Sequence, residues 1–554
     1  MAQHFLQSHH LYLTPLSPLH LGTGEDYQPT EYVMDKGAMY VFDPAQAVLN
    51  KAQYDELMGV AQRGIFIEIQ KYFKKHATTF QNCAYKAIGV SKALENEYTK
   101  KLGETVQREA KGRNVHNQLT IERTAINPHT HQPYIAGSAF KGSIRTALLD
   151  ALTKQNPPQK TPNSRDASRY ENDTLGSFAS DIMRLLKTAD FMPQNTVATQ
   201  IQYAVNHKKR AIIKDGQIQM PRGVTGRRET IQHGQYRSFQ ADCTVQHLCL
   251  AHQPHIKQPE RNLPKENLRP IDIQKLAIAV NTYHLPRWEQ ENNILETRNL
   301  VQPAWLKHTR QLIADLQPQL KTGRVMLMRL GKNGGAESKT LTNLAQIKIM
   351  QGKGQPANFE SSTKTVWLAA QSDKETHGLL PFGWVLIEID PQSDNNALKQ
   401  WCLNNSSHLT DTAQINADLA QRRQQNAERK QAHRQEQQRL AQEQQAAEEA
   451  EQRKAAEQAA ALAAMTPAER LITTWQQQLK NFQFDSRNQQ ASSEFYQNFC
   501  QALQQASEQS FDANTQKTIA EAFAWSKISK QQPNLFSGKR EKEIKTILRQ
   551  LRGE

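Results

Sequence analysis

The amino-acid sequence predicts an α+β body over residues 1–400, a helical linker at 411–465 and an all-α domain at 466–554. The body alternates between short runs with apolar residues at every second position, typical of strands, and stretches with helical three- and four-residue spacing. The linker segment is almost entirely Ala, Gln, Glu, Arg and Lys, with no Gly, Pro, Phe, Tyr or Trp. These are strong helix formers, but large apolar residues are too few for a coiled-coil seam. An exposed helix or semi-rigid linker is therefore favoured over a coiled coil.

Local patterns predict the elements of the body. Residues 32–42 read as two short strands around an Asp-Lys-Gly turn, and residues 44–76 have helical spacing. A further helix is expected at 270–280, because proline fits its first turn. Two stretches rich in proline and charge, 153–175 and 251–269, are expected to be loop-like insertions. The remaining expected strands are 10–16, 230–245, 323–330 and 383–389.

The C-terminal segment begins with a helix start signal. Thr466 is followed by Pro467 and, three residues on, by Glu469, which is the pattern of a capping box. Six Lys and Arg residues lie in or directly after the last of its helices, and they form either a solvated face or a surface for nucleic acid or a partner protein. A small helical bundle is expected, with helices at 467–483, 491–508, 514–529 and 539–551.

Charge and composition narrow the class of protein. The chain has 69 Lys and Arg against 54 Asp and Glu, a net charge of +15, and residues 1–410 carry +13 of it. Such an excess suits a polyanionic partner, of which nucleic acid is the commonest. No run approaches about 18 apolar residues and the start lacks a secretory signal pattern, so we expect a cytoplasmic protein with no membrane span. The five cysteines form no Cys-x-x-Cys pair, which argues against a zinc knuckle or a disulfide framework.

The most informative stretch is Tyr134–Leu149, an extended run that turns into a helix. Lys141 and Arg145 lie one turn apart near the start of this helix, where free N–H groups already favour an anion. The pattern predicts a phosphate-binding site, with an ordinary strand-turn-helix bearing two exposed cations as the alternative. The order of glycine and lysine differs from a Walker A loop, so neither ATP nor another cofactor is expected. Small residues that let a ligand approach the backbone flank the cations: Gly137, Ser138 and Gly142.

Two further glycine-rich loops each follow an expected strand. The first, residues 19–25, contains His20, Gly22 and Gly24. The other, residues 329–340, contains Gly331, Lys332, Gly334 and Gly335. Each loop alone is a weak signal, but three glycine-rich turns that each leave a strand form a specific set.

With the Lys141/Arg145 helix, these loops resemble the RAMP proteins of CRISPR systems, and among them the fifth subunit of the type III-A Csm effector complex. Order and spacing agree over most of 10–390, including a terminal Pro-Phe-Gly-Trp at 381–384. One departure is Lys332-Asn333, where the family often has an aromatic residue. Residues 411–554 have no counterpart in the family pattern.

The resemblance implies RRM-like or ferredoxin-like domains in the body and a non-catalytic RNA-binding role. Such a subunit caps the 3′ part of CRISPR RNA (crRNA) and contacts the repeated backbone subunit of the Csm complex. It also supports crRNA maturation by host trimming nucleases, in antiviral defence. No metal is implied. The implied RNA contacts are Gly137, Ser138, Lys141, Gly142 and Arg145, with His20, Gly22, Gly24, Gly331, Lys332, Gly334 and Gly335 as secondary candidates.

A second cluster of cations precedes the alternating run at 230–245. It comprises Lys208-Lys209-Arg210 and, further on, Arg222, Arg227 and Arg228. The cluster could track RNA phosphates, with Tyr236 or Phe239 stacking on bases. A solvated hairpin tip is the alternative.

Histidines keep a catalytic alternative open. RNA cleavage without metal needs an acid and a base, and His20 or the pair His129 and His131 titrate in the suitable range. No second catalytic partner accompanies His20, so support of the backbone or contact with RNA is favoured for it. No carboxylate or cysteine cluster completes a metal site at His129 and His131, so a solvated turn is favoured for that pair. Two alternatives therefore remain: a RAMP endoribonuclease that processes CRISPR precursor RNA, and a protein-assembly adaptor whose main interface is the C-terminal bundle.

Overall fold

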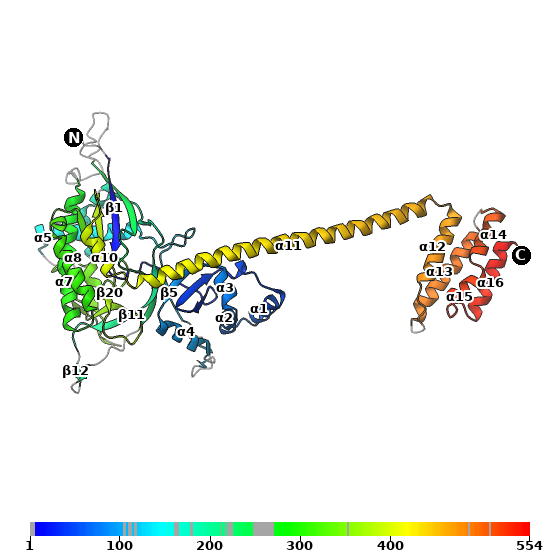
Figure 1. Ribbon diagram of the computed structural model, residues 1–554, viewed down its shortest axis with the longest axis horizontal. Helices are drawn as coiled ribbons and strands as arrows, with labels where there is room; N and C mark the ends of the chain where they lie inside the picture. Colours follow the sequence, from blue (N-terminus) through cyan, green and yellow to red (C-terminus); the bar gives the residue numbers. More distant parts are fainter. Residues whose placement is uncertain are drawn as a thin grey trace, which may run out of the picture. The chain divides into compact units, whose positions relative to one another are not determined.

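The computed structural model of the protein divides the chain into two compact units, Met1–Lys430 and Gln431–Glu554 (Figure 1). The predicted fold class, an α+β body followed by helical segments, is confirmed. The insertion expected at 251–269 lies outside the described residues. The structure describes residues 6–103, 107–108, 114–115, 119–159, 166–177, 181–211, 213–214, 217–218, 225–247, 271–351, 354–485, 488–508 and 511–554.

The first sheet of unit 1 has the strand order β10-β15-β1-β21-β16, with β9 beside β15. All its strand pairs are antiparallel. Helices α5 (Gly137–Gln155) and α7 (Ile273–Thr297) share a core with one face of the strands β15, β1, β21 and β16, as in a ferredoxin-like unit. Its strands are β1 (Leu6–Pro15), β9 (Leu186–Thr188), β10 (Met192–Pro193), β15 (Phe239–Gln246), β16 (Val325–Arg329) and β21 (Trp384–Ile389).

Both faces of this sheet are buried. On β16, Met326 and Met328 enter the core shared with α5 and α7, whereas Val325 and Leu327 enter a core shared with the second sheet. Side chains on β21 alternate between the same two cores. Burial on both faces explains why Val325–Met328 of β16 and Trp384–Ile387 of β21 are continuous apolar runs in the sequence.

The second sheet follows the order β2-β8-β14-β11-β5-β4-β3, with β19 beside β11 and β20 beside β19. The expected hairpin at 32–42 is confirmed, and its turn places Lys36 and Gly37 in the left-handed region (φ 49° and 78°). The strands are β2 (Gly22–Asp26), β3 (Tyr32–Asp35), β4 (Ala38–Phe42), β5 (Ala84–Val90), β8 (Glu122–Thr124), β11 (Thr199–Lys208), β14 (Gly226–Ile231), β19 (Thr365–Ala370) and β20 (Leu380–Pro381).

The remaining elements of unit 1 surround the two sheets. Helix α7 packs on β16 and α8 packs on α10, whereas α2 and α3 pack on β3 and α1 packs on α2 (Figure 1). Among the described residues, no helix combines the length and apolar character needed to cross a bilayer. The helices are α1 (Lys51–Arg63), α2 (Phe66–Lys75), α3 (Ala77–Asn82), α4 (Lys92–Gly103), α6 (Ala167–Leu175), α8 (Pro303–Asp315), α9 (Gln317–Lys321) and α10 (Asn396–Asn404). Single 3₁₀ turns are η1 (Pro44–Gln46), η2 (Ile182–Leu185) and η6 (Ala336–Lys339), and two-stranded ladders are β6 (Gln107–Arg108) with β7 (Asn114–Val115), β12 (Ile213–Lys214) with β13 (Gln217–Ile218), and β17 (Ile347–Ile349) with β18 (Asn358–Glu360).

Two expectations for the body are corrected. Residues 230–245 are not one strand: β14 ends at Ile231 in the second sheet, and β15 begins at Phe239 in the first. The turn between them contains Gly234 at φ 82°, where an added Cβ would lie 2.6 Å from the Asn405 carbonyl oxygen. The stretch 153–175 includes the end of α5 and the whole of α6, so much of it is helical.

Helix α11 (Leu409–Ala464) spans the boundary between the units. Its first turns belong to unit 1, because Ile415 and Leu419 pack into the apolar core formed by β3, β4 and helices α2 and α3. Lys430 Nζ donates to the Gln46 side chain at 2.6 Å. The linker predicted to begin at residue 411 therefore leaves unit 1 about 20 residues later, after Lys430.

Unit 2 has an apolar core of its own, centred on Phe499, Leu503, Phe523 and Ile547. The capping box at Thr466 is confirmed: its Oγ1 accepts from the Glu469 amide, and the Glu469 carboxylate accepts from the Thr466 amide. The single helix expected at 514–529 is two helices. Its helices are α12 (Pro467–Asn481), α13 (Gln489–Glu508), α14 (Ala513–Ala522), α15 (Trp525–Gln531) and α16 (Lys539–Arg552).

Strand β16 forms one edge of the first sheet, and a buried asparagine of α7 satisfies its free backbone groups. Asn281 Oδ1 accepts from the Leu327 amide at 2.8 Å. Its Nδ2 donates to the carbonyl oxygens of Val325 and Leu320 at 2.7 and 2.9 Å. One side chain thus completes an edge that would otherwise expose unpaired N–H and C=O groups.

Replacing this side chain tests the arrangement. We expect Asn281→Ala to lower the free energy of unfolding of unit 1 by about 3 kcal/mol, because three buried backbone groups lose their partners. Urea unfolding followed by tryptophan fluorescence measures the change. Gln290→Ala, on the exposed side of the same helix, serves as the control and should change stability by less than about 0.5 kcal/mol. Equal effects of the two substitutions would contradict the assignment.

Candidate functional site

The three glycine-rich segments meet in one groove of about 790 Å³ in unit 1. The first loop contributes one wall, helix α5 the second, and the loop after β16 the third. We call this the glycine-loop groove. Its lining residues are Leu21, Gly22, Thr23, Gly24, Ala125, Tyr134, Ala136, Ser138, Ala139, Gly142, Ser143, Thr146, Arg329, Leu330, Gly331, Lys332, Ser338 and Lys339.

The first and third loops cross in direct backbone contact. The Lys332 amide donates to the His20 carbonyl oxygen at 2.9 Å. Gly331 lies at φ 79°, and an added Cβ would stand 2.4 Å from that carbonyl oxygen. Only glycine fits this position, because both the backbone angle and the space exclude a side chain.

The second wall begins where α5 meets the chain between β9 and β10. An added Cβ on Gly137 would lie 2.5 Å from the Ala189 carbonyl oxygen. The Gly137 amide donates to Asp190 Oδ1 at 2.7 Å, so a carboxylate of the protein already occupies part of the helix N-terminus. Ser138 and Gly142, one turn apart, are exposed to the groove. The helix therefore presents a small, polar face rather than a free anion site at its first amide.

Lys141 and Arg145 point away from this face, contrary to the expectation that they meet a ligand beside the glycines. Lys141 Nζ donates to the Leu186 carbonyl oxygen at 2.8 Å, and burial lowers the pKa of its ammonium group. Arg145 forms an ion pair with Asp181, and Glu171 lies 3.5 Å away. These contacts tie α5 to the neighbouring segments, and neither cation lines the groove.

His20 is fully buried, which corrects its expected contact with RNA. Its Nδ1 lies 2.7 Å from the Glu229 carbonyl oxygen; since a carbonyl only accepts, this nitrogen carries the proton. Its Nε2 faces Glu122 Oε2 at 3.5 Å. His20 therefore supports the loop from inside and contributes its carbonyl oxygen to the crossing with Lys332.

Glu122 is the electrostatic centre beneath the groove. Lys332 Nζ lies 2.6 Å from its Oε2, and Arg228 reaches both carboxylate oxygens at 2.9 and 3.2 Å. The nearby His20 ring, with Lys332 and Arg228, lowers the pKa of Glu122 to about 2. The carboxylate stays charged at neutral pH and holds the third loop against the first.

Arg227 and Arg228 lie on β14, between β8 and β11, rather than at a hairpin tip. Arg227 pairs with Glu97 and lies over the Tyr203 ring at 5.5 Å. Arg228 is 7% exposed and pairs with Glu122. Their contacts are internal, so the expectation that they track phosphates is not supported by their positions. Arg222, named with them, lies outside the described residues.

Other glycines of the loops differ in environment. Gly22 is close to the His20 ring, Gly24 at φ 84° is open to solvent, and Gly335 lies at φ 73°. Gly334 is buried against the Arg329 side chain. Sequence reasoning missed Ser143, Thr146 and Lys339, which also line the groove. Small residues at 138, 142 and 146, spaced by four, are the signal that marks this helix face.

The groove combines exposed glycine backbone, hydroxyl groups and two exposed lysines, Lys332 and Lys339. Such a set can follow a sugar-phosphate chain through backbone and hydroxyl contacts and point charges. Within the part of the chain that the structure describes, no three His, Cys, Asp or Glu side chains are arranged to hold a metal ion.

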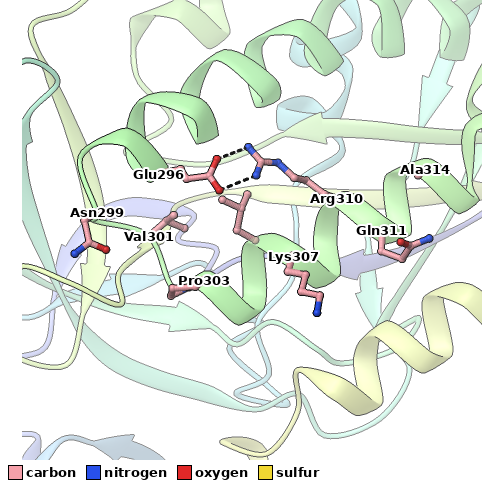
Figure 2. Close-up of a pocket in the computed structure, with 9 residues that line it drawn as sticks. Glu296, Asn299, Val301, Pro303, Lys307, Arg310, Gln311 and Ala314 are labelled. Atoms are coloured by element: carbon pink, nitrogen blue, oxygen red, sulfur yellow. Dashed lines mark hydrogen bonds and ion pairs between the residues drawn. The ribbon is translucent and has the colours of Figure 1, made fainter.

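A second pocket, of about 430 Å³, lies where α7 ends and α8 begins (Figure 2). Figure 2 shows Arg310 facing Glu296, with two hydrogen bonds of 2.9 and 2.8 Å. Arg310 also donates to the Asn293 side chain at 2.8 Å. Arg310 thus already has hydrogen-bond partners within the protein, and none of the three glycine-rich segments lines this pocket. The glycine-loop groove is therefore the stronger candidate for a functional site.

The Glu122 cluster predicts a specific loss of stability in acid. Because the pKa of Glu122 in the folded protein is about 2, below its ordinary value near 4.5, its contribution is complete above pH 4.5. It disappears as pH falls towards 2. We expect Glu122→Gln to lower the free energy of unfolding at pH 7 by about 1–2 kcal/mol, after solvent screening.

Urea unfolding of Glu122→Gln and of the unchanged protein at pH 7, 4.5 and 2.5 measures this effect. The difference in unfolding free energy between the two proteins should be smaller at pH 4.5 than at pH 7, and smallest at pH 2.5. Glu289→Gln, on the exposed surface of α7, should match the unchanged protein throughout. If Glu122→Gln lowers the free energy of unfolding by the same amount at all three pH values, the charge of Glu122 does not have the stabilising role described here.

The chain matches one family model and is similar to several solved structures. The model of the RAMP superfamily matches residues 12–303, more than half of the chain. No curated protein matches the chain. Similar solved structures include a chain of the Csm-crRNA-target RNA ternary complex of a type III-A CRISPR-Cas system, with 17% identity, a TM-score of 0.42, and coverage of 69% of this chain and 100% of that one. Another is the crystal structure of T. onnurineus Csm5, with 14% identity, a TM-score of 0.36, and coverage of 68% and 99%. The family match over residues 12–303 assigns the chain to the RAMP superfamily.

Proposed function

We propose that this protein is a non-catalytic, RNA-binding subunit of a type III-A CRISPR (Csm) effector ribonucleoprotein. The observation that carries the proposal is the convergence of three glycine-rich segments, more than 100 residues apart in sequence, on one groove. Glycine backbone at the surface permits the close approach of a ligand chain, and the crossing at His20 and Lys332 fixes its walls. Membership of the RAMP superfamily supports RNA as that ligand.

The chemistry of the groove suits an RNA backbone. Lys332 and Lys339 supply point charges for phosphates, and the hydroxyls of Ser138, Ser143 and Thr146 can meet phosphate oxygens or the ribose 2′-OH. The lining has few large apolar or aromatic side chains, so sequence readout of bases is not expected there. This suits a subunit that holds a guide whose sequence varies.

A binding role is favoured over RNA cleavage by the state of the histidines. His20 has no exposed surface and its Nδ1 proton is committed to a backbone carbonyl, so it does not reach a 2′-OH. His129 is exposed on a turn, and no carboxylate is bonded to its ring among the described residues. We therefore propose that the protein positions crRNA and leaves its trimming to other nucleases.

The finer assignment follows the resemblance of the motifs to the fifth Csm subunit. In this proposal the groove holds the 3′ part of the crRNA, and a neighbouring surface contacts the repeated backbone subunit in the cytoplasm. Recruitment of trimming nucleases and a part in antiviral defence belong to the same proposal.

Neutralising the two groove lysines tests the binding site. We expect the double variant Lys332→Ala with Lys339→Ala to bind single-stranded RNA about tenfold more weakly at moderate salt, because two phosphate contacts are lost. The slope of log affinity against log salt should fall by about 1.4. Fluorescence anisotropy over a salt series measures both quantities, and thermal unfolding checks that the variant is folded.

The matched control is Lys307→Ala with Lys321→Ala, which removes two exposed lysines outside the groove. It should leave the salt slope unchanged. Lys141→Ala with Arg145→Ala should have little effect on the slope, since neither cation lines the groove. If either of these two double variants lowers the salt slope and the Lys332/Lys339 variant does not, the RNA site lies outside the groove.

The role in the complex is tested by purifying the native assembly through a tag on this chain, crosslinking it, and sequencing the attached RNA and its 3′ ends. Crosslinks near the 3′ end of trimmed crRNA would support the proposal. Crosslinks centred on a repeat junction, or metal-independent cutting of repeat RNA by the purified protein, would favour the endoribonuclease. Partner binding that survives nuclease treatment, with no crRNA attached, would favour the assembly adaptor.

A further inference from the structure

A small pocket of about 190 Å³ lies within unit 1, beside the first turns of α11 and away from the glycine-loop groove. Strand β5, the turn at Asn127–Pro133, the chain leading into β11, and α11 each contribute to it. All four segments belong to Met1–Lys430. We call it the α11-root pocket. Its lining residues are Tyr85, Lys86, Ala87, Thr130, His131, Gln132, Pro133, Thr196, Val197, Thr199, Asn416, Leu419, Ala420 and Arg423.

Two aromatic rings form one wall. The rings of Tyr85 and His131 lie 4.2 Å apart between centroids, inclined by 31°. Both are half-buried, so part of each remains accessible from the pocket. A paired aromatic surface of this kind is suited to stacking with another flat ring.

The turn that carries His131 is held in an uncommon conformation. His131 lies at φ 56°, in the left-handed region that side chains other than Gly, Asn and Asp seldom adopt. Its amide donates to the Asn127 carbonyl oxygen at 2.8 Å, and Asn127 Oδ1 accepts from the amides of His129 and Thr130. These bonds fix the turn with the imidazole against Tyr85. Such locally strained residues concentrate at binding sites.

The electrostatics of the pocket favour an anion near α11. Lys86 Nζ lies 2.5 Å from Glu229 Oε1, and both groups are buried, so their charges largely cancel. Arg423 is exposed, and none of the described side chains pairs with it. Burial lowers the pKa of His131, and Lys86 and Arg423 act in the same direction. The imidazole is therefore neutral at pH 7, and the free positive charge is that of Arg423.

We propose that the α11-root pocket binds one unpaired nucleotide of an RNA strand, with the base stacked against His131 and Tyr85 and the phosphate facing Arg423. The volume is below that of a pocket for a whole cofactor and suits a single base. A flat ring wall and a guanidinium on the opposite wall match the two ends of a nucleotide. The inference rests on the proposed RNA-binding function and adds a second contact region, distinct from the glycine-loop groove.

Two substitutions remove the two halves of the pocket. His131→Asn removes the ring but retains the turn, because asparagine tolerates the left-handed conformation. Arg423→Gln removes the charge from α11. Matched controls come from the same elements: His129→Asn on the same turn and Arg429→Gln, also exposed, on the same helix.

The experiment uses the full chain with an unstructured oligouridine that carries 4-thiouridine, followed by anisotropy, photo-crosslinking and peptide mapping. We expect each pocket variant to bind about fivefold more weakly, and each control within about twofold of the unchanged protein. Crosslinks should map to peptides around Tyr85 and His131 as well as to the groove. Both pocket variants should lose the first set and retain the second.

Several results would overturn the inference. Crosslinks at the groove alone, with Arg423→Gln equal to Arg429→Gln, would reject the pocket and leave the proposed function standing. Crosslinks at the pocket alone would reject the groove as the RNA site while supporting the pocket. RNA binding by neither region would reject both proposals.

Discussion

The glycine-loop groove depends on one backbone contact, the hydrogen bond from the Lys332 amide to the His20 carbonyl oxygen. This bond joins the loop after β1 to the loop after β16, whose positions in the chain are about 300 residues apart. Its geometry requires glycine at 331, and the buried His20 ring and the charged Glu122 carboxylate support the two loops from below. These contacts hold the first and third loops together, so the walls of the groove are in position before a ligand binds. Preorganisation of this kind reduces the entropy that binding must overcome.

Much of the fold could be predicted from the sequence, because the spacing of apolar residues shows which side of a helix or strand is buried. The hairpin at 32–42, helix α5 and strands β16 and β21 lie where apolar spacing indicates. Of helix α7 only the start was predicted: the helix expected at 270–280 begins at Ile273 and continues to Thr297. The run at 230–245 was misjudged because two strands in different sheets share one alternating pattern, and only the tertiary contact of Gly234 with Asn405 separates them. Helix α6 was missed because its many charged and polar residues resemble a loop.

The site was predicted well at the level of segments and poorly at the level of side chains. Glycines mark where backbone must approach closely, and that property is local, so the three loops were found. The direction of a cation is not local. Lys141 and Arg145 face Leu186 and Asp181, and Arg227 and Arg228 face Glu97 and Glu122, all distant in sequence. Which charge is free and which is paired is decided by tertiary structure alone.

The packing of Ile415 and Leu419 into unit 1 also bears on how the extension can vary in evolution. The compositional change near residue 411 is not the point at which the chain becomes dispensable. A gene truncated there would lose the apolar residues that cover the helices beside β4, and would expose a hydrophobic patch. A shorter homologue, or a split gene, is expected to retain the sequence to about Lys430 and to differ freely only beyond it.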